Sequence, residues 1–190
     1  PTLRRQRQMC IRDRMLPNAI DQFYIDIAKP NFEAKICLFH QRFSTNTLPK
    51  WHLAQPFRLL AHNGEINAIR GNRNWARARQ SKFSSPLIPK INKFKDLVNE
   101  TGSDSSALDN MIELLNKGGI DLFRALRMVL PPAWQNVHSI DQDLKAFHEY
   151  NSMHMEAWDG PAGIVLSDGR LAICLLCLLY TSDAADEVLG

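Results

Sequence analysis

The sequence predicts an α+β fold, and three observations support this class. Short apolar runs typical of strands lie towards both ends of the central region, helix signals are grouped between them, and 45% of the 190 residues are apolar. That apolar content is enough for a buried core. Because the helices are grouped and do not alternate with strands, a layered α+β arrangement is favoured over a strictly alternating parallel sheet.

The two ends of the chain are excluded from the fold prediction. One DNA sequence that can encode residues 4–13 also encodes residues 177–186 when its reverse complement is translated. This inverted repeat resembles a translated sequencing-library adapter. We therefore expect residues 1–14 and 177–190 to be non-native tails, and residues 15–176 to be one partial domain.

Four short segments are predicted to form the strands. The segments 35–39 and 56–61 are apolar runs bounded by polar turns. The segments 162–166 and 170–176 flank Ser-Asp-Gly, which is typical of the turn of a β-hairpin. Together these strands supply the predicted sheet.

Three helices are predicted between the early strands and the hairpin, from their capping residues and apolar stripes. No internal repeat or low-complexity linker interrupts them. The helices are expected between Gly102 and Gly118, over residues 122–129, and from a capping box of Ser139 and Gln142 through Tyr150.

Composition bears on several classes of protein. The net charge is +3, and the region between the oppositely charged tails is nearly neutral, which counts against nucleic-acid binding. No apolar run approaches the roughly 20 residues of a membrane span, and no signal peptide is visible. Cys37 and Cys174 lie in apolar runs without pairing or ligand spacing, so we expect buried thiols in a cytoplasmic protein. The histidines show no metal-site spacing.

The first of three polar clusters is HQRFSTNT, from His40 to Thr47. Arg42 follows a predicted strand, and a guanidinium can hold a carboxylate through two parallel hydrogen bonds. Taken alone, a surface ion pair is the commoner role of such an arginine. The cluster by itself leaves both roles open.

The second cluster is His62-Asn63-Gly64-Glu65, after an apolar run. The carboxamide of Asn63 and the main-chain N–H of Gly64 can both point at one oxygen, which is what a tetrahedral acyl-transfer intermediate requires. Asn-Gly is also the commonest dipeptide of tight turns. By itself the pair is therefore better explained as a turn.

The third cluster is TGSDS, from Thr101 to Ser105, at the entrance to a predicted helix. In the simpler interpretation Asp104 caps that helix and complements its dipole. In the sharper one it binds an ammonium group. Together with Arg42, Asn63 and Gly64 it would then describe a site for an α-amino acid whose side-chain amide is attacked.

These residues carry a resemblance to a known family. The stretches HQRFSTNT, LAHNGEIN and TGSDSS occur in this order and are followed by PPAWQN and DGPAGIVLSDGR. The series resembles the glutamine amidotransferase domain of the glutamate synthase large subunit, across nearly all of residues 15–176. The last two stretches separate this family from other class II amidotransferases. The resemblance implies the N-terminal-nucleophile hydrolase fold, a four-layer αββα sandwich that is incomplete here.

The resemblance also implies roles for individual residues. Arg42 matches the arginine that holds the α-carboxylate of glutamine, and Asp104 matches the acid that receives the α-amino group. Asn63 and Gly64 match the oxyanion hole.

Thr45 and His62 are expected near the same pocket as supporting residues. In similar domains an N-terminal cysteine attacks the amide, with its own amino group as the base. That cysteine is expected upstream of this segment, because Cys10 lies in a tail and Cys37 lies mid-chain. The chain by itself is therefore predicted to have no glutaminase activity.

The full-length enzyme implied by the resemblance uses FMN and an iron–sulfur cluster to convert 2-oxoglutarate and ammonia into glutamate. No cofactor is expected to bind residues 15–176. The expected partners are glutamine, the remainder of the large subunit, and either ferredoxin or a small subunit that works with a pyridine nucleotide. No nucleic acid and no membrane are expected as partners.

Three alternatives stay open. The domain could belong to another class II amidotransferase, or it could be a scaffold that only binds. The basic stretch 70–82 could bind nucleic acid, with Trp75 as a stacking platform. If this stretch is a helix on which Arg70, Arg73 and Arg77 cluster while Trp75 and Ala78 face the core, a solvated basic face is the simpler explanation.

Overall fold

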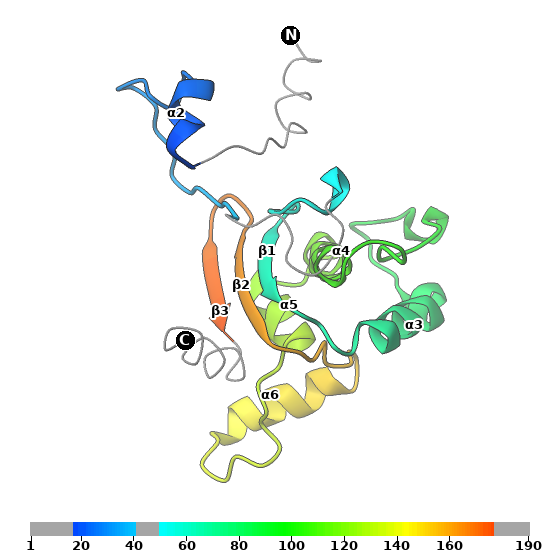
Figure 1. Cartoon of the computed structure of the whole chain (residues 1–190). Coiled ribbons are helices and arrows are strands. Elements are labelled where there is room, and N and C mark those ends of the chain that lie inside the picture. The colour runs from blue at the N-terminus through cyan, green and yellow to red at the C-terminus, as the bar shows by residue number, and fades with distance from the viewer. Residues whose placement is uncertain (1–16, 41–49, 177–190) are drawn as a thin grey trace. The chain divides into compact units, whose positions relative to one another are not determined.

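The computed structural model describes residues 17–40 and 50–176 (Figure 1). The described residues divide into two compact units, one formed by residues 17–37 and 50–54 and the other by residues 38–40 and 55–176. In the described part of the first unit the regular elements are short: η1 (Pro17–Ala19), α2 (Ile20–Phe23) and η2 (Trp51–Leu53). All strands of the described residues belong to the second unit.

The second unit contains an antiparallel sheet of three strands in the order β1-β2-β3 (Figure 1). The strands are β1 (Leu60–Gly64), β2 (Ala162–Ser167) and β3 (Ala172–Leu176). β2 and β3 form the predicted hairpin, whose turn is held by Asp168: its Oδ1 accepts hydrogen bonds from the N–H groups of Arg170 and Leu171. Gly169 adopts a φ of +89° in this turn, a conformation that favours glycine.

Helices α4 (Asp104–Lys117) and α5 (Leu122–Val129) pack together and share a core with the sheet. Along β2 the buried side chains alternate with partly buried ones, so one face of the strand meets the helices. Burying one large apolar side chain contributes roughly 1.5–3 kcal/mol, and this core therefore holds the sheet against α4. Its fully buried members include Leu60, Ile164 and Leu166 from the strands and Leu108, Met111, Ile112 and Leu126 from the helices.

The remaining elements of the second unit are helical. They are α3 (Ile69–Arg79), η3 (Gln80–Lys82), η4 (Ile91–Lys93) and α6 (Gln142–Ser152). The capping box predicted from Ser139 and Gln142 is wrong, because α6 begins at Gln142 and its N-cap is Asp141, whose Oδ1 accepts from the N–H of Leu144 at 3.0 Å. The helix itself lies where the sequence placed it.

The early strands differ from the prediction. Residues 35–39 contain no strand, and the apolar run 56–61 becomes a strand only from Leu60 onwards. Phe57 bends the chain before that point, donating its N–H to the carbonyl of Leu60 at 2.8 Å. The strand also lies further along the chain than predicted, since it continues through the polar residues His62 and Asn63 to Gly64.

Two predictions of burial are wrong. Cys37 and Cys174 are both exposed. Cys174 lies opposite Val165, on the face of the sheet that the helices do not cover, whereas its neighbour Ile173 points into the core. On α3 the buried residues are Asn72 and Ala76, so the helix is rotated relative to the prediction; Trp75 is 54% exposed and Ala78 is exposed.

The described residues thus form an α+β arrangement with one small antiparallel sheet, in agreement with the predicted class. Across residues 17–40 and 50–176, none of the helices combines the length and apolar character needed to cross a bilayer.

Candidate functional site

The main chain of β1 offers hydrogen bonds along two edges. Leu59 accepts from the N–H of Ser167, and Glu65 donates to the carbonyl of Pro161, both at 2.9 Å, so the odd-numbered residues face β2. Successive main-chain groups of a strand point to opposite edges. The N–H groups of the even-numbered residues from Leu60 to Ile66 therefore face the outer edge, away from β2.

Side chains take three of the four donors on this outer edge. The pairs are Leu60 N–H with Asp109 Oδ1 (3.0 Å), His62 N–H with Gln55 Oε1 (2.6 Å) and Ile66 N–H with Asp104 Oδ2 (2.8 Å). For the fourth donor, the N–H of Gly64, the described residues provide no acceptor. Within residues 17–40 and 50–176, side chains thus occupy the outer edge of β1 except at Gly64.

Asn63 and Gly64 are strand residues, and the turn considered for this dipeptide is wrong. Asn63 lies opposite Gly163 and Gly64 opposite Ala162. Gly64 has a φ of +137°, and a Cβ there would collide with the carbonyl of Pro161, so the strand needs glycine at this position. The side chain of Asn63 is exposed on the face opposite to that of His62.

Asp104 lies in the first turn of α4 but does not cap it. The N-cap is Ser103, whose hydroxyl accepts from the N–H of Ser106 at 3.1 Å. The half-buried carboxylate of Asp104 instead accepts from Ile66 through Oδ2 and from the hydroxyl of Ser105 through Oδ1 at 3.3 Å. A carboxylate has about four lone-pair sites, so Asp104 retains capacity for a further donor.

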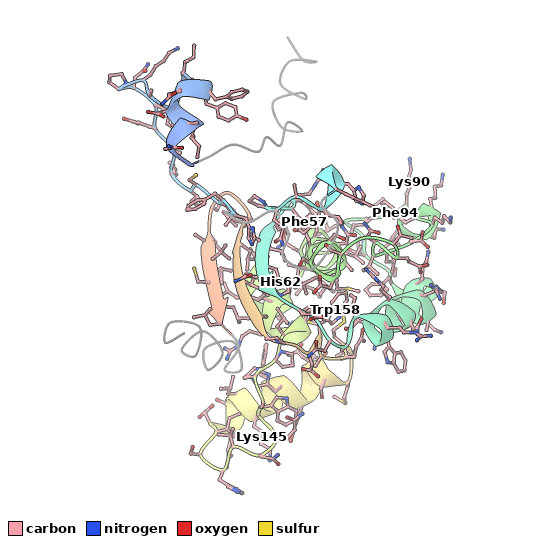
Figure 2. All side chains as sticks on the ribbon, viewed as in Figure 1. Phe57, His62, Lys90, Phe94, Lys145 and Trp158 are labelled. Atoms are coloured by element: carbon pink, nitrogen blue, oxygen red, sulfur yellow. The ribbon has the colours of Figure 1, made fainter. Side chains whose placement is uncertain are left out.

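His62, labelled in Figure 2, is buried, with 2% of its surface exposed. Its Nδ1 lies 2.8 Å from the hydroxyl of Ser105. Burial lowers the pKa of His62; the charge of Asp104 and the carbonyl of Pro161 oppose this, and His40 adds to it. The Nε2 atom is buried and makes no well-formed hydrogen bond to a described group. His62 therefore joins β1 to the first turn of α4 as a neutral ring inside the core.

Asp109 secures the beginning of β1 from the middle of α4. Its carboxylate accepts from the N–H groups of Arg58 (3.3 Å), Leu59 (2.8 Å) and Leu60 (3.0 Å). Burial raises the pKa of Asp109, although these three hydrogen bonds favour the charged form. The side chain fixes β1 relative to α4, and with it the position of the residues at the far end of the strand.

The structure thus brings four of the six predicted site residues together where β1 ends beside α4: Asn63, Gly64, His62 and Asp104. Arg42 and Thr45 lie outside the described residues. Sequence reasoning missed Ser105 and Gln55. Ser105 stands inside the TGSDS cluster and could have been found there, whereas no pattern in the sequence singles out Gln55.

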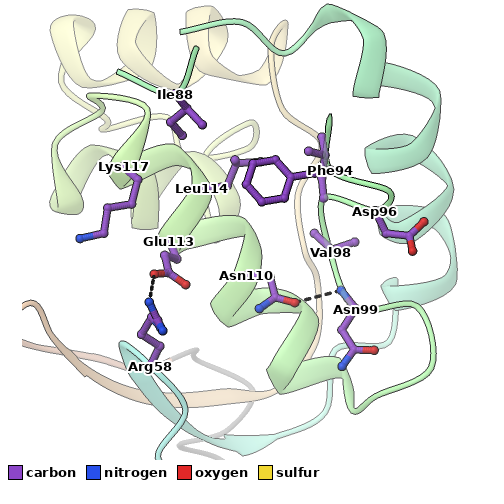
Figure 3. A pocket seen from close by; sticks show the side chains of 11 residues that line it. Arg58, Ile88, Phe94, Asp96, Val98, Asn99, Asn110, Glu113, Leu114 and Lys117 are labelled. Atoms are coloured by element: carbon purple, nitrogen blue, oxygen red, sulfur yellow. Dashed lines mark hydrogen bonds and ion pairs between the residues drawn. The ribbon is translucent and has the colours of Figure 1, made fainter. Parts of the chain in front are cut away.

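A separate cavity of about 600 Å³ lies between α4 and the segment 88–99 (Figure 3). Phe94, Val98 and Leu114 form apolar parts of its wall, and the ion pair of Arg58 with Glu113 (3.2 Å) lies at one side. None of the predicted site residues lines it. The cavity is therefore distinct from the cluster at the end of β1.

The arginines of α3 are engaged in contacts within the protein. Arg73 donates to the carbonyls of Asn99 (3.0 Å), Gly102 (2.7 Å) and Ser103 (3.2 Å). Arg77 pairs with Glu100 at 2.6 Å, and Arg79 pairs with Glu156. Part of this stretch therefore holds the turn before α4 in place through hydrogen bonds, and the stretch is not simply a solvated basic face.

Comparisons with known proteins show the family of the chain. Residues 4–177 match the model of the class-II glutamine amidotransferases. The chain belongs to this family. The family predicted from HQRFSTNT, LAHNGEIN and TGSDSS is therefore confirmed.

Curated relatives of this chain include several glutamate synthases. They include a ferredoxin-dependent glutamate synthase of Cyanidium caldarium (44% identical over 154 residues, 80% of this chain and 10% of the relative) and the NADH glutamate synthase of Saccharomyces cerevisiae (41% over 167 residues, 87% and 8%). The large chain of the NADPH glutamate synthase of Bacillus subtilis is 42% identical over 157 residues, 82% of this chain and 10% of the relative. The chain spans about a tenth of the length of these relatives.

The described residues contain no group of metal ligands. No three of their His, Cys, Asp and Glu residues lie close enough together to hold an ion. An iron–sulfur cluster is typically held by four cysteines, and the described residues contain Cys37 and Cys174, which lie in different units. These residues do not fit a cluster.

Proposed function

We propose that this chain supplies the glutamine-binding and oxyanion-stabilising part of a glutaminase site in a glutamate synthase. The observation that carries the proposal is the outer edge of β1, where no described group accepts from the N–H of Gly64, while side chains occupy the donors on either side of it. Asn63, whose side chain is exposed, is the residue directly before Gly64. Asp104 binds the chain two residues further on, a span of at most about 7 Å, which one amino acid can bridge.

The proposed chemistry follows from these groups. A thiolate attacks the side-chain amide carbon of glutamine, and the amide oxygen becomes an oxyanion in the tetrahedral intermediate. The N–H of Gly64 and the carboxamide of Asn63 donate hydrogen bonds to that oxygen. Collapse of the intermediate, with a proton delivered to the leaving nitrogen, gives a glutamyl thioester and ammonia, and water then releases glutamate. Loss of one such donor typically costs about 3 kcal/mol of transition-state stabilisation.

The remaining residues hold the two charged ends of the substrate. Asp104 receives the α-ammonium group with the lone pairs that Ile66 and Ser105 leave available. We assign the α-carboxylate to Arg42, with Thr45 beside it. His62 supports the pocket from within the core, because its ring binds Ser105 and so helps to hold the first turn of α4.

We further propose that the attacking cysteine is not among the residues of this chain. The four cysteines of the sequence, Cys10, Cys37, Cys174 and Cys177, are internal residues whose amino groups are in peptide bonds, so none provides the free α-amino base of this mechanism. In the full-length enzyme FMN and an iron–sulfur cluster would carry out the reductive step with 2-oxoglutarate, using electrons from ferredoxin or a pyridine nucleotide. The names of the relatives include both kinds of electron donor, which supports the assignment of the donor classes.

The fold proposal is the four-layer sandwich. Asn63, Cys174 and Leu176 are exposed on one face of the sheet, Leu176 by 65%, although Ala61 on the same face is buried. A second sheet packed on this face would bury these side chains and place Asn63 between the two layers, at the end of the strands.

Calorimetric titration of the 190-residue chain with L-glutamine tests the substrate assignment. We expect measurable binding that weakens at least tenfold in Asp104→Asn and in Arg42→Met, because each variant removes the partner of one charged end. Asp96→Asn is the matched control, an exposed acid that lines the separate cavity. Unchanged affinity in both site variants would contradict the proposal.

An ammonia-release assay tests the position of the nucleophile. The chain should release no ammonia from glutamine above background, and Cys37→Ala and Cys174→Ala should behave identically to it. Release that disappears in either variant would show that a cysteine of this chain does the chemistry.

A further inference from the structure

We propose that Gln55 is a positioning residue: its carboxamide replaces a neighbouring strand at a single residue of β1 and thereby keeps the N–H of Gly64 open and aimed. The proposal rests on the oxyanion role assigned to Gly64 above. It adds a residue that makes no contact with the substrate itself.

The geometry is that of a strand pairing reduced to one side chain. Gln55 Oε1 accepts from the N–H of His62 at 2.6 Å, and Gln55 Nε2 donates to the carbonyl of His62 at 2.9 Å. An adjacent antiparallel strand makes the same two bonds to a residue of a hydrogen-bonded pair. The two contacts also fix which end of the amide is oxygen, since the N–H of His62 requires an acceptor.

The consequence concerns the next donor along the edge. A real strand pairing His62 would continue and cover the N–H of Gly64, whereas a carboxamide ends after one residue. Gln55 therefore satisfies the main chain of His62 and stops short of Gly64. An edge with which another strand could otherwise pair is thereby left with one main-chain N–H, that of Gly64, to which no described group binds.

Gln55 also fixes the direction of the N–H of Gly64. Asp109 holds the start of β1 and Asp104 holds Ile66, but between them Gln55 is the described side chain that binds the outer edge. It binds both main-chain groups of the residue two positions before Gly64. Without Gln55, the main chain of β1 would be free to change its twist here. The direction of the N–H of Gly64 would then no longer be fixed.

Hydrogen exchange measured by NMR tests the contact directly. In Gln55→Met, which keeps the side-chain volume and removes both hydrogen bonds, the amide of His62 should exchange at least tenfold faster and the amide resonance of Gly64 should shift. The matched control is Gln80→Met, because Gln80 also binds main-chain carbonyls, those of Phe94 and Lys95, away from β1. Unchanged exchange at His62 in Gln55→Met would overturn the proposal.

Ligand discrimination tests the functional consequence. L-Glutamine carries the amide oxygen that Gly64 would bind, and L-norvaline is a similar α-amino acid without it. Gln55→Met should weaken binding of L-glutamine about tenfold and leave that of L-norvaline unchanged. Equal weakening for both ligands, or for neither, would overturn the positioning role. If the unmodified chain binds neither ligand, the proposed function fails, and the exchange experiment still decides whether Gln55 controls the edge.

A pH rescue distinguishes positioning from general packing. A neutral carboxyl group has one donor and one acceptor, as the carboxamide does towards His62, whereas a carboxylate has only acceptors. Gln55→Glu should therefore resemble Gln55→Met at pH 7. Protection of His62 should return, relative to the unmodified chain at the same pH, as the pH falls towards the ordinary glutamate pKa of about 4.3. Absence of any recovery in a folded variant would contradict the two-bond contact.

Discussion

Helices α3 and α4 both carry a row of like charges, and the structure uses the two rows in different ways. The carboxylates of α4, Asp104 and Asp109, bind main-chain N–H groups of β1 and its flanks. The arginines of α3 bind carbonyls and carboxylates of other segments.

The contacts of the two helices are linked, because α3 holds the turn before α4 and α4 holds β1. Arg73 holds the carbonyls of Gly102 and Ser103, the turn that leads into α4. The first turn of α4 then holds His62 and Ile66 around Gly64. The basic stretch 70–82, which resembles a nucleic-acid surface in the sequence, thus contributes to the placement of Asp104 through contacts that its composition does not reveal.

The comparison predicts the largest effect at Asp109. Asp109→Ala leaves three main-chain donors at the start of β1 without their acceptor, two of them with short bonds. We expect the free energy of unfolding to fall by about 3 kcal/mol in urea titrations. Asp96→Ala, an exposed acid, should change it by less than about 0.5 kcal/mol. Similar losses in the two variants would show that Asp109 does not anchor the strand.

A smaller loss is expected when α3 is disconnected from the turn before α4. Arg73→Met keeps the aliphatic stem and removes three hydrogen bonds to carbonyls. We expect a loss of about 2 kcal/mol in the same titration. Arg70→Met, an exposed position on the same helix, is the control and should be nearly neutral. A loss of stability at Arg70 that equals the loss at Arg73 would mean that the positive charge of α3, and not the hydrogen bonds of Arg73, stabilises the protein.

The cap of α4 should have an effect of about 1 kcal/mol. Ser103→Ala removes the hydroxyl that accepts from the N–H of Ser106, while Asp104 keeps its bond to Ile66. Ser84→Ala serves as an exposed comparison. If Asp104 were the cap, Ser103→Ala would be neutral and Asp104→Ala would carry the loss.

The smallest expected effect is a pH dependence from His62. Burial lowers its pKa in the folded protein below the ordinary value of 6.5, so the unfolded chain binds a proton first as the pH falls. The associated stability is present above pH 6.5 and is lost as the pH falls through the folded pKa. Unfolding measured between pH 7.5 and 5.5 should therefore depend less on pH in His62→Gln than in the unmodified chain.

His148 provides a second, separate case. Burial also lowers its pKa, and it packs against Trp134 and Phe147, away from β1. His148→Gln should remove its own share of the pH dependence, and the double variant should remove both. If His62→Gln follows the unmodified chain at every pH, the ring of His62 is not buried in the neutral form.

The hairpin and the helices could be predicted from the sequence because their signals are local. Asp168 and Gly169 determine a turn through contacts within four residues, and the apolar stripes of α4 and α5 are periodic along the chain. The family was also predictable, since HQRFSTNT, LAHNGEIN and TGSDSS are specific when they occur in order.

The tertiary structure decided where the polar groups of the site meet. Local preference favoured a turn at Asn63 and Gly64 and a cap at Asp104. Pairing with β2 made the first a strand, and Ser103 took the place of the second. Asp104 and Asp109 meet β1 across about 40 to 50 residues of sequence, and a contact over that separation has no local signal. The sequence by itself therefore determined the elements and the family, whereas long-range packing determined which main-chain donor stays open.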